Sequence, residues 1–162
     1  MFKRIYLTTL LGLTLGVVTT AKEVDTQNAA IATNLGLYGG QATDIAPDPL
    51  SDTVYHTNGA PNGLFVSSDS GGSWVGLPSD VNYGVGRDVT VDPDTGTAFA
   101  TVGDTLLRST DQGSTWEDIT LNINSSMAVG LIAAHGRLLV GLQNGAIAIS
   151  ADNGDSFFTV TA

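Results

Sequence analysis

One eight-residue motif occurs three times in this chain at a nearly constant spacing. It reads SSDSGGSW at 67–74, STDQGSTW at 109–116 and SADNGDSF at 150–157. The copies therefore begin 42 and 41 residues apart. A fixed period of about forty residues is the signature of a repeat architecture, in which each repeat is one supersecondary unit. The motif predicts a chain built from stacked copies of a single unit.

The segments around each motif are typical of short β-strands. They are β-branched or apolar, and Gly, Asp, Asn and Pro residues bound them. The second repeat is the clearest, with strands expected at 88–91, 97–102, 105–109 and 116–121. Four antiparallel strands in about forty residues form one blade of a β-propeller. We therefore predict an all-β chain with about three four-stranded blades, at about 40–83, 84–126 and 127–162.

The motif itself is expected to form the hairpin between the third and fourth strands of each blade. Its fifth residue, glycine, can adopt the positive φ that such a turn requires. Its Asp can accept backbone N–H groups, its first Ser can bond locally, and its final aromatic ring is expected to be buried. These structural residues are Ser67, Asp69, Gly71 and Trp74; Ser109, Asp111, Gly113 and Trp116; and Ser150, Asp152, Gly154 and Phe157.

The pattern S-x-D-x-G-x-x-W resembles the Asp-box, or BNR repeat. This motif is found in the β-propellers of sialidases, xyloglucanase-type glycoside hydrolases, sortilin-type receptors and photosystem II assembly factors. Two copies match fully, and the third departs only at Phe157. The resemblance implies a structural box at the blade periphery, away from any ligand site.

Candidate binding residues follow from strand direction. Because direction alternates within a blade, the boxes share one face, and the loops after the second and fourth strands share the opposite face. The first of these loops, 56–62, is long and rich in Gly, Pro and Asn, a composition common in functional loops. We predict binding residues on this face at His56, Asn58, Asn62, Tyr83 and Arg87.

Catalysis is not favoured by the residues present. Resemblance to sialidases implies a set of arginines, and of Arg87, Arg108 and Arg137 only the first is expected on the ligand face. Resemblance to xyloglucanases implies an acid after the second strand of the first blade, where Asn58 stands instead. An amide cannot act as a general acid or base. Asp44 and Asp88 are more simply explained as backbone-bonding residues at the start of their strands.

The favoured function is a non-catalytic binding or assembly scaffold for a protein or a glycan. The alternative is the N-terminal part of a secreted glycoside hydrolase whose catalytic residues lie mostly outside this chain, so whether the chain is an enzyme stays open. We expect no cofactor and no metal, because His56 and His135 are isolated, Cys is absent, and the loop 92–96 lacks the closing Glu of a calcium loop.

The N-terminus is typical of a secretory signal peptide at 1–21. Lys3 and Arg4 precede an apolar run at 5–18 and the small residues 19–21. We therefore expect a secreted or periplasmic protein that is not embedded in a membrane once processed. The remaining chain carries four basic residues against sixteen acidic ones, a balance that argues against nucleic acid as a partner.

Three blades are fewer than the roughly four to eight with which propellers close. The segment 22–39 contains a possible closing strand at 29–37. We expect either further blades in the same gene product or a homo-oligomer to complete the ring.

Overall fold

The computed structural model describes residues 40–59, 63–77, 84–120 and 127–161. They form three separate antiparallel sheets of four strands each, in the order predicted for propeller blades. The expected all-β architecture is confirmed. Within the described ranges, no helix is long and apolar enough to cross a membrane.

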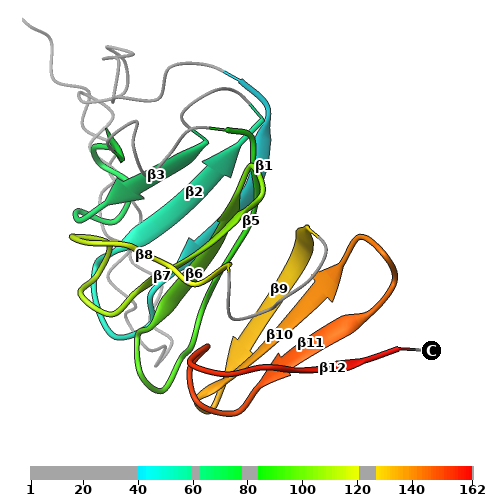
Figure 1. Cartoon of the computed structure of the whole chain (residues 1–162). Helices are drawn as coiled ribbons and strands as arrows, with labels where there is room; N and C mark the ends of the chain where they lie inside the picture. Colours follow the sequence, from blue (N-terminus) through cyan, green and yellow to red (C-terminus); the bar gives the residue numbers. More distant parts are fainter. Residues whose placement is uncertain (1–39, 60–62, 78–83, 121–126, 162) are drawn as a thin grey trace, which may run out of the picture. The chain divides into compact units, whose positions relative to one another are not determined.

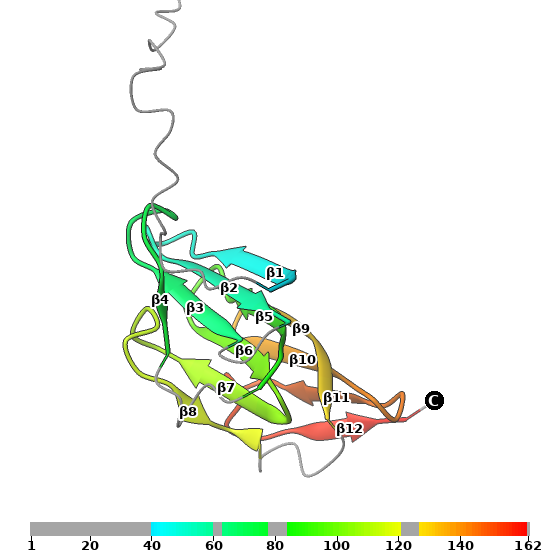
Figure 2. The same cartoon turned by 90° about the horizontal axis from the view of Figure 1, so that it is seen from above.

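Figures 1 and 2 show the three blades following one another along the chain. Their strands are, for blade 1, β1 (Ala42–Pro47), β2 (Val54–Asn58), β3 (Leu64–Ser67) and β4 (Val75–Gly76); for blade 2, β5 (Gly86–Val91), β6 (Ala98–Val102), β7 (Thr105–Ser109) and β8 (Glu117–Asp118); and for blade 3, β9 (Ala128–Ala134), β10 (Arg137–Leu142), β11 (Ile147–Ser150) and β12 (Phe158–Val160).

All three blades use the same strand register. Asp44 pairs with Thr57 in blade 1, Asp88 with Thr101 in blade 2, and Gly130 with Gly141 in blade 3. An irregularity in pairing lies near the start of each inner strand, next to these pairs. Positions in one blade therefore have defined equivalents in the other two, and differences between equivalents can be interpreted.

The hydrophobic core lies between the blades. One cluster joins Tyr55 and Leu64 of blade 1 to residues of blade 2 such as Val89 and Leu107. A second cluster joins Phe99 of blade 2 to blade 3, where its main members are Leu131, Leu138, Val140 and Ala148. The facing sides of blades 1 and 2, and those of blades 2 and 3, thus cover each other, as expected for radial stacking.

The inner strands β1, β5 and β9 are linked by carboxylates. Asp44 Oδ2 accepts the Val89 N–H at 3.1 Å, and Asp88 Oδ2 accepts the Leu131 N–H at 2.8 Å. Each bond runs from one blade to the inner strand of the next. Asp44 and Asp88 do bond backbone, as proposed above. Asp44 Oδ1 accepts the Ile45 N–H of its own strand at 2.8 Å, and both carboxylates also bond the following blade.

The fourth strands are shorter than expected. In blade 2 the prediction was 116–121, whereas β8 covers only Glu117–Asp118, and Leu121 lies outside the described residues. Trp116 belongs to the turn instead, because its indole Nε1 donates to the Gly113 carbonyl at 3.2 Å. The predicted signal peptide 1–21, the segment 22–39, Asn62 and Tyr83 also lie outside the described residues.

Candidate functional site

The three boxes form the same hydrogen-bonded turn. In the first, Ser67 Oγ accepts the Gly71 N–H at 2.8 Å and donates to Asp69 Oδ1 at 2.7 Å. Asp69 also accepts the N–H and the hydroxyl of Ser73, each at 2.7 Å. Gly71, Gly113 and Gly154 have φ values of 90°, 80° and 89°, which glycine adopts without strain. The Ser, Asp and Gly of each box thus hold the turn through bonds within the box.

The hydroxyl at the seventh box position is a partner that the sequence analysis missed. Ser73, Thr115 and Ser156 each donate to the second oxygen of their box Asp. The signal was present, since all three copies carry Ser or Thr at this position. Hydrogen bonds favour the charged carboxylate, so the pKa of Asp69 falls to about 2, chiefly through Ser67 and then Ser73. The pKa of Asp152 also falls to about 2, chiefly through Ser156, and that of Asp111 is lowered, chiefly through Thr115.

The second and third boxes pack against the preceding blade. A Cβ added at Gly113 would lie 2.9 Å from Val66 Cγ1 and 3.0 Å from Tyr55 Cε1. One added at Gly154 would lie 2.8 Å from Ile119 Cδ1 of blade 2. Glycine is therefore required at both positions by the neighbouring blade as well as by the turn.

The aromatic rings of the boxes are only half-buried, so the expectation of buried rings is wrong. The Trp116 ring meets Tyr55 of blade 1 edge-to-face, with ring centroids 5.8 Å apart. Phe157 packs against the cluster between blades 2 and 3. The rings lie at the rim of the contact between blades, where one edge remains in solvent.

The first box has different surroundings. Trp74 meets His56 of its own blade edge-to-face, with centroids 5.8 Å apart, and the His56 ring stacks on Phe65. A Cβ added at Gly71 would meet only Trp74, at 3.7 Å. These residues lie on the side of blade 1 that faces away from blade 2, which we call the head face and define by Ile45, His56 and Trp74.

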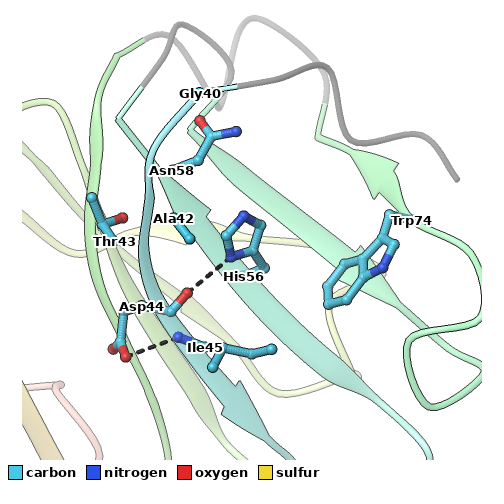
Figure 3. Close-up of a pocket in the computed structure, with 8 residues that line it drawn as sticks. All are labelled: Gly40, Ala42, Thr43, Asp44, Ile45, His56, Asn58 and Trp74. Carbon is cyan, nitrogen blue, oxygen red and sulfur yellow. Dashed lines mark hydrogen bonds between the residues drawn. The ribbon is translucent and has the colours of Figure 1, made fainter. Parts of the chain in front are cut away.

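A pocket of about 630 Å³ opens on the head face (Figure 3). It is lined by Gly40, Ala42, Thr43, Asp44, Ile45, His56, Asn58 and Trp74. His56 Nδ1 lies 3.0 Å from the Asp44 carbonyl. Because a carbonyl only accepts, Nδ1 carries the proton in this contact.

The polar lining is specific to blade 1. Pairing opposite Ile45 places His56 where the other blades have Ala100 and Val140. In the same way, Asn58 stands where they have Val102 and Leu142. The blades that pack on a preceding blade thus carry aliphatic residues at both positions, whereas the head face carries an imidazole and an amide.

His56 and Asn58 were expected in a loop, and this placement is wrong, because β2 extends through Asn58. The regular pairing of β1 with β2 keeps both residues in the strand. Arg87 does not join them: it is exposed on β5, and its Nε donates to the Gly103 carbonyl at 3.3 Å. The pocket therefore unites two of the five predicted residues with Trp74, which had been assigned a purely structural role.

A second pocket, of about 410 Å³, opens on the far side of blade 3. Its lining is mostly apolar and consists of Asp88, Gly130, Leu131, Ile132, Leu139, Gly141 and Ile147. We call this side the tail face and define it by Ile132, Leu139 and Ile147, which are 65%, 37% and 45% exposed. Among the described residues, no group of three or more potential metal ligands comes together.

Each pocket has one carboxyl group in its lining, Asp44 in the first and Asp88 in the second. Burial and the neighbouring Asp44 raise the pKa of Asp88 to about 6. Both side chains already accept a backbone N–H from the next blade. Their arrangement suits a structural link between blades more than a pair poised on either side of a substrate.

Solved structures decide the fold. A structure of YCF48 bound to a D1 peptide superposes with a TM-score of 0.58 at 17% identity, over 74% of this chain and 39% of that one. YCF48 from Cyanidioschyzon merolae gives 0.62 at 18% identity, over 75% of this chain and 37% of that one. Both are β-propeller proteins. The chain has a β-propeller fold.

An ancestral GH74 enzyme is also similar to this propeller chain, with a TM-score of 0.62 at 21% identity. The alignment covers 76% of this chain but only 18% of the enzyme. The chain thus spans less than two fifths of each of these proteins. No family model and no curated protein sequence matches it.

Proposed function

We propose that the chain is part of an exported β-propeller that binds a segment of a protein partner without catalysing a reaction. The observation that carries this proposal is the head pocket. It combines an aromatic edge at Trp74, an imidazole at His56 and an amide at Asn58 in one concave site. An apolar ring beside a few fixed polar groups is the usual composition of a binding pocket.

The shape and charge of the site favour a peptide. The pocket runs from Gly40, just before β1, along the strand to Ile45, so an extended segment can follow the strand while one side chain enters beside Trp74. The chain has a net charge of −10, which favours a neutral or basic segment. One similar structure, YCF48, holds a peptide, which is consistent with this use of the fold.

Binding to arrays of peptides and of glycans, measured side by side, tests the proposal. We expect selected peptides to bind, and His56→Ala and Trp74→Ala to weaken them about tenfold or more, a loss of about 1.4 kcal/mol. His56→Ala is expected to fold, because blade 2 has Ala100 at the equivalent position. Phe158→Ala is the matched control, since Phe158 is 58% exposed on blade 3 and does not line the pocket. Glycan binding alone, or peptide binding unaffected by both head variants, would refute it.

A glycoside hydrolase remains the second candidate because Asp88, with its raised pKa, lies beside Asp44. A carboxyl whose pKa is raised can serve as the general acid of glycoside hydrolysis. Turnover of chromogenic glycosides that Asp88→Asn abolishes would favour this candidate, whereas peptide binding without turnover favours the scaffold.

A further inference from the structure

The glycine and the final aromatic ring of each box border a small space, which we call the box slot. In box 2 the slot lies between Gly113 and Trp116, and blade 1 places Tyr55 in it. The rings of Tyr55 and Trp116 meet edge-to-face, with centroids 5.8 Å apart and an interplanar angle of 88°. Tyr55 Cε1 also lies only 3.0 Å from the position of a Cβ on Gly113. The slot of box 2 is thus occupied by an aromatic ring from the preceding blade.

The slot of box 3 holds a ring in the same way. Phe99 Cε1 of blade 2 lies 3.4 Å from the position of a Cβ on Gly154, and Phe157 packs against the cluster that contains Phe99. Tyr55 and Phe99 are equivalent by register, because each lies opposite the residue two positions after the Asp of its inner strand. Both slots therefore receive the aromatic ring from one equivalent position.

The two occupied slots hold the ring without bonding a hydroxyl group. Among the described residues, the buried Tyr55 hydroxyl has no hydrogen-bond partner. Phe99, at the equivalent position, has no hydroxyl at all. The box slot is therefore complementary to an aromatic ring, and it accepts phenylalanine as well as tyrosine.

The slot of box 1 is open on the head face. Of the described residues, only Trp74 lies within 4 Å of a Cβ placed on Gly71, at 3.7 Å. The ring that Trp74 meets is His56, which belongs to the same blade. Because Trp74 also lines the head pocket, the open slot adjoins the site where the peptide is proposed to bind.

The head face is less suited to a whole blade than the two internal faces are. Internally, Tyr55 shares a cluster with Ala100, and Phe99 shares one with Val140. His56 stands at the equivalent position on the head face, and its ring is larger than either aliphatic side chain. Covering an imidazole with an apolar sheet costs free energy unless the sheet supplies a hydrogen bond. A single side chain of an extended segment can instead enter the slot while the imidazole stays hydrated.

The backbone of the head face differs in the same sense. Val89 and Leu131 each donate their N–H to a carboxylate of the preceding blade, Asp44 or Asp88. At the equivalent Ile45, Asp44 Oδ1 of the same blade accepts the N–H at 2.8 Å. The head face thus has a carboxylate of its own where the internal faces receive one from another sheet.

We propose that the segment bound at the head face carries a phenylalanine or tyrosine whose ring enters the slot of box 1, beside Gly71 and Trp74. This inference rests on the proposed function, because the ring belongs to the peptide that follows β1. The ring meets Trp74 edge-to-face, the arrangement that aromatic pairs favour and that Tyr55 adopts with Trp116. The partner is therefore a protein with an exposed, extended segment that contains an aromatic residue.

A small aromatic probe tests the slot without requiring the peptide to be known. The chain has two tryptophans, so the ¹⁵N-labelled full chain gives two side-chain indole signals in an NMR spectrum, and Trp74→Phe assigns them. We expect N-acetyl-phenylalaninamide to shift the signal of Trp74 and to leave that of Trp116 in place. A Trp74 signal that does not move, or that moves as far with N-acetyl-leucinamide, would overturn the inference.

Two glycine variants separate occupation of the slot from an effect on the turn. Gly71→Ala places a Cβ where the incoming ring lies, so the shift of the Trp74 signal should be lost. Gly145→Ala is the matched control, because Gly145 has a φ of 85° against 90° for Gly71, and nothing lies within 4 Å of its Cβ position. This variant should keep the shift. A folded Gly71→Ala chain that responds like the wild type contradicts the inference.

Substitution within a bound peptide distinguishes this inference from the proposed function. For peptides selected on the array, replacing the aromatic residue by leucine should weaken binding about tenfold. Peptides that bind without any aromatic preference overturn the inference and leave the proposed function standing. If no peptide binds while N-acetyl-phenylalaninamide still shifts Trp74, the proposed function is refuted and the aromatic specificity of the slot is supported.

Discussion

Box 1 and box 2 are the same turn in different surroundings. Both have the Ser–Asp–Gly hydrogen bonds, with Ser67 Oγ 2.8 Å from Gly71 N and Ser109 Oγ 2.9 Å from Gly113 N. Box 2 presses on Val66 and Tyr55 of the preceding blade, whereas box 1 borders an open pocket. The bonds within the box thus determine the shape of the turn. Packing against the preceding blade determines how much the stability of the protein depends on the box residues.

The largest expected effect compares Gly113→Ala with Gly71→Ala. Both place a Cβ at positive φ, which costs about 1–2 kcal/mol. At Gly113 the Cβ also lies about 3 Å from Val66 and Tyr55, and overpacking of this kind costs about 1–3 kcal/mol more. We expect losses of unfolding free energy of about 2–5 kcal/mol for Gly113→Ala and about 1–2 kcal/mol for Gly71→Ala, measured by denaturant titration. Equal losses would show that the neighbouring blade adds nothing to the requirement for glycine.

A smaller effect is expected from the two tryptophans. Replacing a fully buried ring by Ala lowers the unfolding free energy by about 3–5 kcal/mol. Trp116 is half-buried and contacts Tyr55, so we expect Trp116→Ala to lower it by about 2 kcal/mol. Trp74→Ala should cost about 1 kcal/mol or less, because its ring contacts His56 at the edge of the pocket. Denaturant titration of both variants measures the difference. If Trp74→Ala destabilised more than Trp116→Ala, the assignment of Trp116 to the contact between blades would be wrong.

Much of the fold followed from the sequence because it depends on local chemistry. The box residues fix a turn through their own backbone and side chains, and the spacing of the boxes fixes the length of a blade. The predicted and observed bounds of β7, Thr105–Ser109, agree for the same reason: turn residues lie at both ends of the strand.

The head pocket could not be predicted in the same way. Its distinctive feature is that His56 and Asn58 replace aliphatic residues at equivalent positions in the other blades, and those equivalences depend on cross-strand register. The sequence identified both residues but placed them in a loop, because they stand in a stretch rich in Gly, Pro and Asn. The observed strand β2 continues through Asn58. Trp74 could not be separated from Trp116 at all, since only tertiary packing distinguishes two copies of one motif.

The smallest expected effect concerns two carboxylates, one bonded within a box turn and one buried at the contact between blades. Asp69 is bonded within its own box, and its pKa falls to about 2, whereas burial beside Asp44 raises the pKa of Asp88 to about 6 from 3.8. The raised pKa means that the folded chain holds the Asp88 proton after the unfolded chain has lost it, so stability falls as the pH rises from about 4 to about 6 and then levels off. Asp69 has the opposite sign, because its contribution is present above about pH 4 and is lost as the pH falls towards 2.

Unfolding free energies measured across this pH range separate the two carboxylates. Asp88→Asn keeps an acceptor for the Leu131 N–H but removes the titration, so it should abolish the decline between about pH 4 and 6. Asp69→Asn is the matched control: it should leave that decline in place and weaken the acid-side loss below about pH 4 instead. A decline that persists unchanged in Asp88→Asn would mean that another group titrates at the contact between blades, and that burial between sheets does not set the protonation of this carboxyl.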